Sequence, residues 1–187
     1  MAEFDATMFT IAKDVKLQAE FNPETVKSYR LIGYNTRRLE NEEFNDDLKD
    51  AGDIGSGHNV TAFYELIPAG SGQDDTAVDP LKYSSKATTG SDDFFTIKVR
   101  YKELDGDDSR LMEHRVRADA FGNAESENFL FASAVAEFGL LVTYSEYRGD
   151  SSLQSVLRRA KEGLGSDIYG LRSEFLELVG EYRQIVD

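Results

Sequence analysis

The chain has 187 residues, a formal net charge of −14 at pH 7 and no cysteine. Its 40% hydrophobic content is enough for a folded core, so the composition excludes a disordered chain. The negative charge disfavours nucleic acids and anionic membranes as partners, and the lack of cysteine excludes disulfides and thiolate metal sites.

Targeting signals are missing as well. No apolar run reaches the ~18 residues that a membrane-spanning helix needs, so no transmembrane segment is predicted. Residues 1–5 lack the basic start and apolar centre of a signal peptide. We therefore expect the chain to be part of a longer protein, in which residues 1–12 are the end of a preceding region or a linker from it.

Alternating apolar and polar residues predict β-strands in the first part of the chain. Residues 15–21 show this period of two, and residues 26–34 repeat it after a turn at Asn22-Pro23. A third strand is predicted over residues 59–68. It ends at Pro68, because proline cannot donate a hydrogen bond to a neighbouring strand.

A hairpin is predicted farther along the chain. Residues 69–93 are rich in Gly, Ser and Asp, which predicts a long exposed loop. Residues 94–103 and 109–118 alternate on either side of a turn signal at Asp105-Gly106. The apolar side chains of the first of these strands share one face: Phe95, Ile97, Val99 and Tyr101.

Helical periodicity replaces the alternation near residue 125. A first helix is predicted over residues 125–144 with Ser126 near its start, and Asp150 or Ser151 is expected to cap a second helix. A third is predicted over residues 167–185. Because strands come first and helices last, we expect an α+β fold, with an antiparallel β-sandwich-like region at residues 13–124 and a bundle of about three helices at residues 125–187.

One polar, glycine-rich segment is the candidate binding site. Its residues are Asp50, Asp53, Gly55, Gly57 and His58, which we expect to form a tight loop because glycine allows backbone conformations that other residues rarely adopt. A cryptic hydrolase around His58 is a weaker hypothesis, since neither a nucleophile elbow nor a third oriented group accompanies the histidine. We therefore predict no catalytic residues.

The acidic segment 40–53 is the candidate metal site. Calcium binds several carboxylate oxygens, and Asp46, Asp47 and Asp50 are the candidate ligands. Their spacing matches no known calcium loop, so a solvated acidic loop is the favoured interpretation and no cofactor is expected. A calcium-dependent binding domain stays as the alternative.

Several stretches resemble a known family. They include Phe9-Thr-Ile-Ala-Lys-Asp-Val-Lys-Leu-Gln, Asp50-Ala-Gly-Asp-Ile-Gly-Ser-Gly-His, Val60-Thr-Ala-Phe-Tyr-Glu-Leu-Ile-Pro and Phe131-Ala-Ser-Ala-Val-Ala-Glu-Phe-Gly-Leu-Leu. These are similar to the region that follows the von Willebrand factor type A domain in bacterial YfbK-like proteins. The resemblance runs from about Phe9 to the helical tail and is weakest over residues 69–93.

The resemblance implies a function only in outline. The C-terminal domain of these proteins has no assigned activity, and its members are typically exported, often as lipoproteins. Their metal-dependent adhesion site lies in the upstream domain and needs an Asp-x-Ser-x-Ser motif, which this chain lacks, so no metal role carries over. We therefore expect a non-enzymatic accessory module of the cell envelope, periplasm or cell surface. It would pack on the upstream von Willebrand factor type A domain through Asp50–His58; another cell-envelope protein is the alternative partner.

Overall fold

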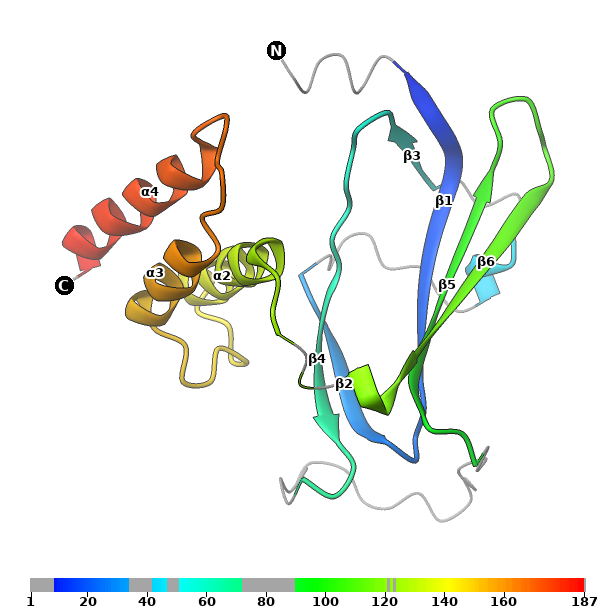
Figure 1. The fold of residues 1–187 in the computed structure, drawn as a ribbon, viewed down its shortest axis with the longest axis horizontal. Coiled ribbons are helices and arrows are strands. Elements are labelled where there is room, and N and C mark those ends of the chain that lie inside the picture. The colour runs from blue at the N-terminus through cyan, green and yellow to red at the C-terminus, as the bar shows by residue number, and fades with distance from the viewer. Residues whose placement is uncertain are drawn as a thin grey trace. The chain divides into compact units, whose positions relative to one another are not determined.

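The computed structural model describes residues 9–33, 42–46, 51–71, 90–120, 122 and 124–186. The chain divides after Gly122 into two compact units. Among the described residues, the first unit contains six strands and the second three helices (Figure 1). The predicted α+β fold, with antiparallel sheets before C-terminal helices, is confirmed.

Four strands form the larger sheet of the first unit. They are β1 (Thr10–Phe21), β3 (Gly52–Gly55), β5 (Asp93–Lys102) and β6 (Ser109–Arg117). Their order is β3-β1-β5-β6, and each neighbouring pair is antiparallel. Because β1 starts at Thr10 and pairs with β3 from that residue on, residues 10–12, predicted as part of a remnant or linker, pair within this sheet. Residues 1–8 lie outside the described part.

Two shorter strands form a separate antiparallel ribbon: β2 (Val26–Ile32) and β4 (Phe63–Pro68). The strand predicted over residues 59–68 ends at Pro68 as expected, but it starts four residues late. Its first residue, Phe63, pairs with Ile32, where β2 ends. Without a partner strand, residues 59–62 have no regular structure.

An aromatic cluster joins the ribbon to the larger sheet. The ring of Phe21, at the end of β1, lies 4.1 Å from Tyr29, 5.3 Å from Tyr64 and 5.5 Å from Phe95, measured between ring centroids. At the turn between β1 and β2, the Asn22 side-chain amide donates to the Asp93 carbonyl at 2.7 Å. The two sheets therefore meet in a sandwich-like manner at this end.

The second unit consists of α2 (Glu127–Val142), α3 (Leu153–Glu162) and α4 (Leu171–Val186). The predicted role of Ser126 is confirmed, because its hydroxyl accepts from the Phe129 N–H at 3.1 Å. The residue that caps α3 is Ser152, one position after the predicted candidates, because Ser152 and Ser155 satisfy each other's backbone N–H.

The third helix starts four residues after its predicted beginning. Asp167, the expected first residue, accepts from the N–H groups of Arg172 and Ser173 at 3.0 and 2.9 Å. Its carboxylate therefore satisfies the first turn of α4 from outside the helix. The core of this unit consists of four wholly buried small side chains: Ala134, Val156, Ala160 and Val179.

Candidate functional site

The predicted binding segment is partly an edge strand. Asp53 and Gly55 lie in β3, which pairs with β1, and the Ser56 N–H extends the pairing to the Phe9 carbonyl at 2.7 Å. Glycine-rich residues form a strand here because β1 offers its unpaired edge. Asp50 lies outside the described residues.

Asp53 supports an irregularity in β1. Its carboxylate accepts from the Asp14 N–H at 3.2 Å, and Asp14 has a positive φ of 50° within a β-bulge. The Asp14 carboxylate in turn accepts from the Ala51 N–H at 3.3 Å and pairs with the Lys102 ammonium at 2.7 Å. Asp53 therefore has a structural role, in holding β3 against the bulge.

Gly57 and His58 form the turn that follows β3. Gly57 has a φ of +78°, and the His58 N–H donates to the Gly55 carbonyl at 3.1 Å. The His58 side chain is exposed, and within the described ranges its ring hydrogen bonds to neither Asp53 nor Ser56. The turn thus presents the His58 ring to solvent.

The acidic segment folds onto the larger sheet through a lysine. Lys16 is only 2% exposed, and its ammonium donates to the backbone carbonyls of Glu43, at 3.1 Å, and of Asp46. Phe44, in the 3-10 turn η1 (Glu42–Phe44), is buried under the Arg100 guanidinium. In the described part of this segment, the oxygens that face Lys16 are therefore backbone carbonyls, already bonded to a cation of the protein.

The calcium alternative has no support from the described residues. Among them, no three His, Asp or Glu side chains converge in a way that could hold a metal ion. The Asp46 side chain is exposed, and the other two candidate ligands, Asp47 and Asp50, lie outside the described part.

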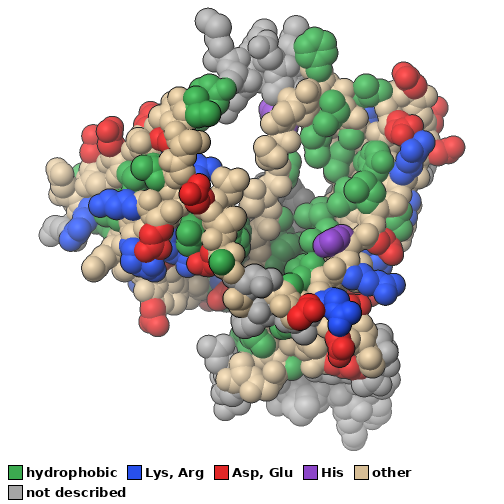
Figure 2. Space-filling view, viewed as in Figure 1, with side chains coloured by type: hydrophobic (Ala, Val, Ile, Leu, Met, Phe, Trp, Pro, Cys, Tyr) green, Lys and Arg blue, Asp and Glu red, His purple; other side chains and the backbone are tan. Residues whose placement is uncertain are grey.

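The apolar face of the larger sheet is a surface that sequence reasoning did not find. We call it the open sheet face; its residues are Leu17, Ala19, Ile97, Val99, Tyr101 and Met112. Leu17, Val99 and Met112 form one row across three strands, and Leu17 is 47% and Met112 58% exposed. Figure 2 shows hydrophobic side chains gathered over this sheet.

The aromatic cluster covers only one end of this face. Phe21 and Phe95 contact the ribbon, whereas no residue of the open sheet face is buried. The alternation in the sequence correctly placed Phe95, Ile97, Val99 and Tyr101 on one face. The alternation does not indicate how far other segments cover this face, because that depends on the packing of residues far apart in the chain.

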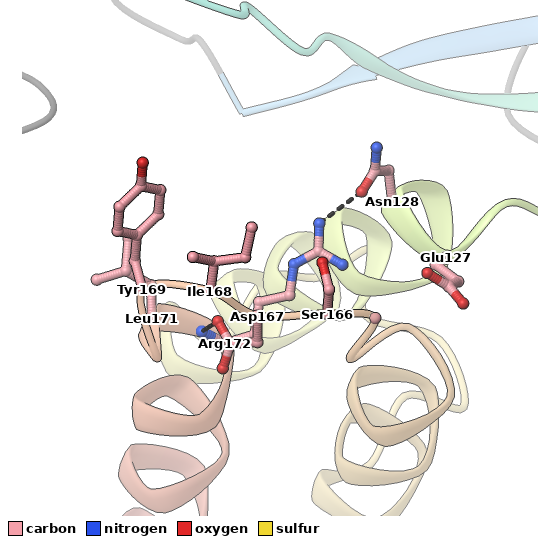
Figure 3. Close-up of a pocket in the computed structure, with 9 residues that line it drawn as sticks. Glu127, Asn128, Ser166, Asp167, Ile168, Tyr169, Leu171 and Arg172 are labelled. Carbon is pink, nitrogen blue, oxygen red and sulfur yellow. Dashed lines mark hydrogen bonds between the residues drawn. The ribbon is translucent and has the colours of Figure 1, made fainter.

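The second unit has a cleft of about 270 Å³ between the start of α2 and the α3–α4 loop (Figure 3). Arg172 spans it, donating to the Gly163 carbonyl at 2.6 Å and to the Asn128 side chain. Hydrogen bonds from the Arg172 N–H and the Ser173 hydroxyl hold the pKa of Asp167 below its usual range. These polar groups of the cleft thus form hydrogen bonds that stabilise the α3–α4 loop.

Comparisons with known proteins agree on one family. A family model described as "Uncharacterized protein YfbK, C-terminal" matches residues 6–185. Uncharacterized protein YfbK of Escherichia coli (strain K12) is 37% identical over 182 residues, which cover 95% of this chain and 31% of that protein. The chain therefore spans about a third of the length of this curated relative. No solved structure matches.

A membrane-spanning helix is not found in the described ranges, where no helix is both long and apolar enough.

Proposed function

Because the chain belongs to the family of YfbK C-terminal domains, we propose that it is a non-catalytic interaction module that packs on another region of the same polypeptide. The observation that carries the proposal is the open sheet face. A sheet in a folded domain normally buries its apolar side against a second layer. Here that side includes Leu17 and Met112, both about half exposed.

The expected partner is the region that precedes the domain in full-length family members. Most of the curated relative, all but 31%, lies outside the aligned region, and the family model describes a C-terminal part. We propose that the partner is a von Willebrand factor type A domain and that the protein is exported to the cell envelope, as the resemblance implies. Full burial of an exposed Leu or Met side chain contributes about 1.5–3 kcal/mol, and covering the exposed half of Leu17 or Met112 would contribute about half of that.

The turn at Gly57-His58 is proposed as a second contact. Its backbone is fixed by the pairing of β3 with β1, and its side chains face solvent. Of the predicted contact residues, Gly57 and His58 therefore lie in a turn that follows a paired strand, whereas Asp53 and Gly55 are part of that strand.

Binding of the purified chain to the preceding region of the same protein tests the proposal by calorimetry. Leu17→Asp should weaken binding at least tenfold, because it places a charge in the central row, and Leu17→Lys should do the same with the opposite charge. Ile168→Asp, which alters an exposed apolar residue of the second unit, is the control and should bind like the natural chain.

The result that would overturn the proposal is binding that neither Leu17 variant weakens, with both variants folded by circular dichroism. His58→Ala separates the two contacts. A loss of affinity supports the turn as part of the interface, whereas unchanged affinity removes the turn and leaves the sheet face. Fractionation of cells that produce the full-length protein checks the expected export.

A further inference from the structure

The outer strand β6 leaves a long edge unpaired. It is the last strand in the sheet order of the described residues. The six residues from Arg110 to Arg115 are all exposed. Such an edge presents backbone N–H and C=O groups that can pair with another strand. The strand contains no proline that would block this pairing.

The charged side chains of β6 indicate what kind of strand could pair with this edge. Arg110 pairs with Glu103 at 2.7 Å, and Arg117 lies 3.8 Å from the Asp119 carboxylate. Arg115, by contrast, has no carboxylate within ion-pair distance in the part of the chain that the structure describes. Within the hairpin it lies opposite Thr96. Within the described ranges, Arg115 is therefore a cation of this edge without an ion pair, two positions away from Glu113.

A second copy of β6 can place opposite charges across from each other in one register. When two β6 strands pair antiparallel around a twofold axis, only residues on the same face lie opposite each other. An axis at His114 places Glu113 opposite Arg115 twice and Met112 opposite Val116 twice.

The neighbouring registers fit less well. An axis at Glu113 opposes two glutamates, and an axis at Arg115 opposes two arginines. An axis at Met112 gives neither charge an opposite partner, because Glu113 then faces Leu111 and Arg115 faces Ser109. We propose that the chain forms a homodimer in which β6 pairs with β6 of a second copy, with the twofold axis at His114. The two sheets then become one continuous sheet.

The dimer is a weak one. A single paired strand on each side buries less than the roughly 1,200–2,000 Å² of a standard stable interface. We therefore expect dissociation on dilution through the micromolar range, which sedimentation velocity over a concentration series measures directly.

A charge exchange within one chain tests the register. Glu113→Arg and Arg115→Glu should each raise the dimer dissociation constant at least tenfold, because each puts like charges opposite each other. The double variant Glu113→Arg/Arg115→Glu restores two opposite pairs and should bind within about threefold of the natural chain. Arg158→Glu, on an exposed position of α3, is the control and should have no effect.

Two outcomes would overturn the proposal: a natural chain that is monomeric at every concentration, and a double variant that stays as weak as the single ones. An acidic peptide as the true partner predicts a different result, since Glu113→Arg would then bind more tightly and dimer formation would be absent.

Single cysteines give an independent measurement, because the chain has none of its own. Residues directly opposite in an antiparallel pair have Cα atoms about 4.5–5.5 Å apart, within the range of a disulfide. His114→Cys should therefore form a covalent dimer under mild oxidation, whereas His58→Cys, at the other histidine, should not. Preferred cross-linking through Met112→Cys, Glu113→Cys or Arg115→Cys would refute the register.

Met112 belongs to both the dimer contact and the open sheet face, but the charge exchange tests the dimer separately from the proposed function. Glu113 and Arg115 alternate with Met112 and His114, so they lie on the face opposite to Leu17 and Val99. Their variants leave the open sheet face intact and should still bind the preceding region.

Discussion

The helical unit and the four-stranded sheet differ in how far their apolar side chains are buried. Side chains of all three helices meet in a closed core, where Ala134, Val156, Ala160 and Val179 have no exposed surface. Around them, the rings of Phe131, Phe138 and Phe175 pack edge to face. The apolar face of the sheet has no buried residue at all.

Polar interactions join the strands of the sheet to neighbouring segments. The Lys16 ammonium donates to a backbone carbonyl of the acidic segment, and the Asp14 carboxylate pairs with Lys102 and accepts from the Ala51 N–H. The helical unit therefore buries its apolar side chains within itself, whereas in the described part of the first unit the apolar face of the larger sheet stays partly exposed.

The largest effect is expected at the closest approach between helices. A Cβ added at Gly163, at the end of α3, would clash with the backbone of Phe131 and lie 2.6 Å from the Glu127 carbonyl oxygen. Gly163→Ala should therefore lower the free energy of unfolding of the helical unit by about 1–3 kcal/mol. Chemical denaturation followed by helical circular dichroism measures it.

Gly139 is the matched control, because a Cβ there meets nothing within 4 Å. Gly139→Ala, inside α2, should raise stability by roughly 0.5–1 kcal/mol. If both substitutions have the same sign, the tight core assigned to the helical unit is wrong.

A second experiment removes the buried lysine of the sheet. Lys16→Met keeps the aliphatic stem but leaves the carbonyls of Glu43 and Asp46 without their donor. We expect a loss of about 1–2 kcal/mol, since water can replace part of the lost bonding. Hydrogen exchange should quicken over residues 42–46.

Lys98→Met is the comparison for that change. Lys98 pairs with Glu20 on the same sheet but near the surface, so its loss should cost only about 0–1 kcal/mol. Equal effects at the two lysines would show that burial of Lys16 contributes nothing.

A third experiment uses pH. Hydrogen bonds to Arg172 and Ser173 hold the pKa of Asp167 low in the folded chain. The stability that Asp167 contributes is therefore complete above its unfolded pKa of about 3.9 and is lost as the pH falls through the lower folded value. In thermal melts from neutral to strongly acidic pH, the melting temperature of Asp167→Asn should fall less than that of the natural chain. Asp150→Asn, at an exposed aspartate, should melt like the natural chain throughout.

The smallest effect is expected from calcium. Because Lys16 already occupies the carbonyls of the acidic segment, melts with millimolar calcium and with EDTA should coincide. Calcium bound at 100 times its dissociation constant would add about 2.7 kcal/mol and raise the melting temperature by several degrees. A rise of that size, abolished by neutralising Asp46, Asp47 and Asp50, would revive the calcium-binding alternative.

Local chemistry explains which predictions from the sequence succeeded. Ser126 at the start of α2, Pro68 at the end of β4 and the hairpin turn at Gly106 depend on residues a few positions apart. The order of strands before helices, and the family to which the chain belongs, could likewise be recognised from the residues alone.

The predictions that failed concern residues whose partners lie far away in the chain. Gly52–Gly55 forms a strand only because β1 lies beside it, some 40 residues earlier. Lys16 occupies an outward position in an alternating strand, yet it is buried because the segment around Phe44 folds over it.

The α+β class and most element boundaries could be predicted from the residues, because they follow from backbone propensities, caps and the period of apolar residues. The exposure of the apolar sheet face and of the β6 edge, in the described part of the chain, became visible only in the folded structure. Alternation marks Leu17 and Val99 as apolar neighbours of a common face, but whether another layer lies on them depends on how distant segments pack.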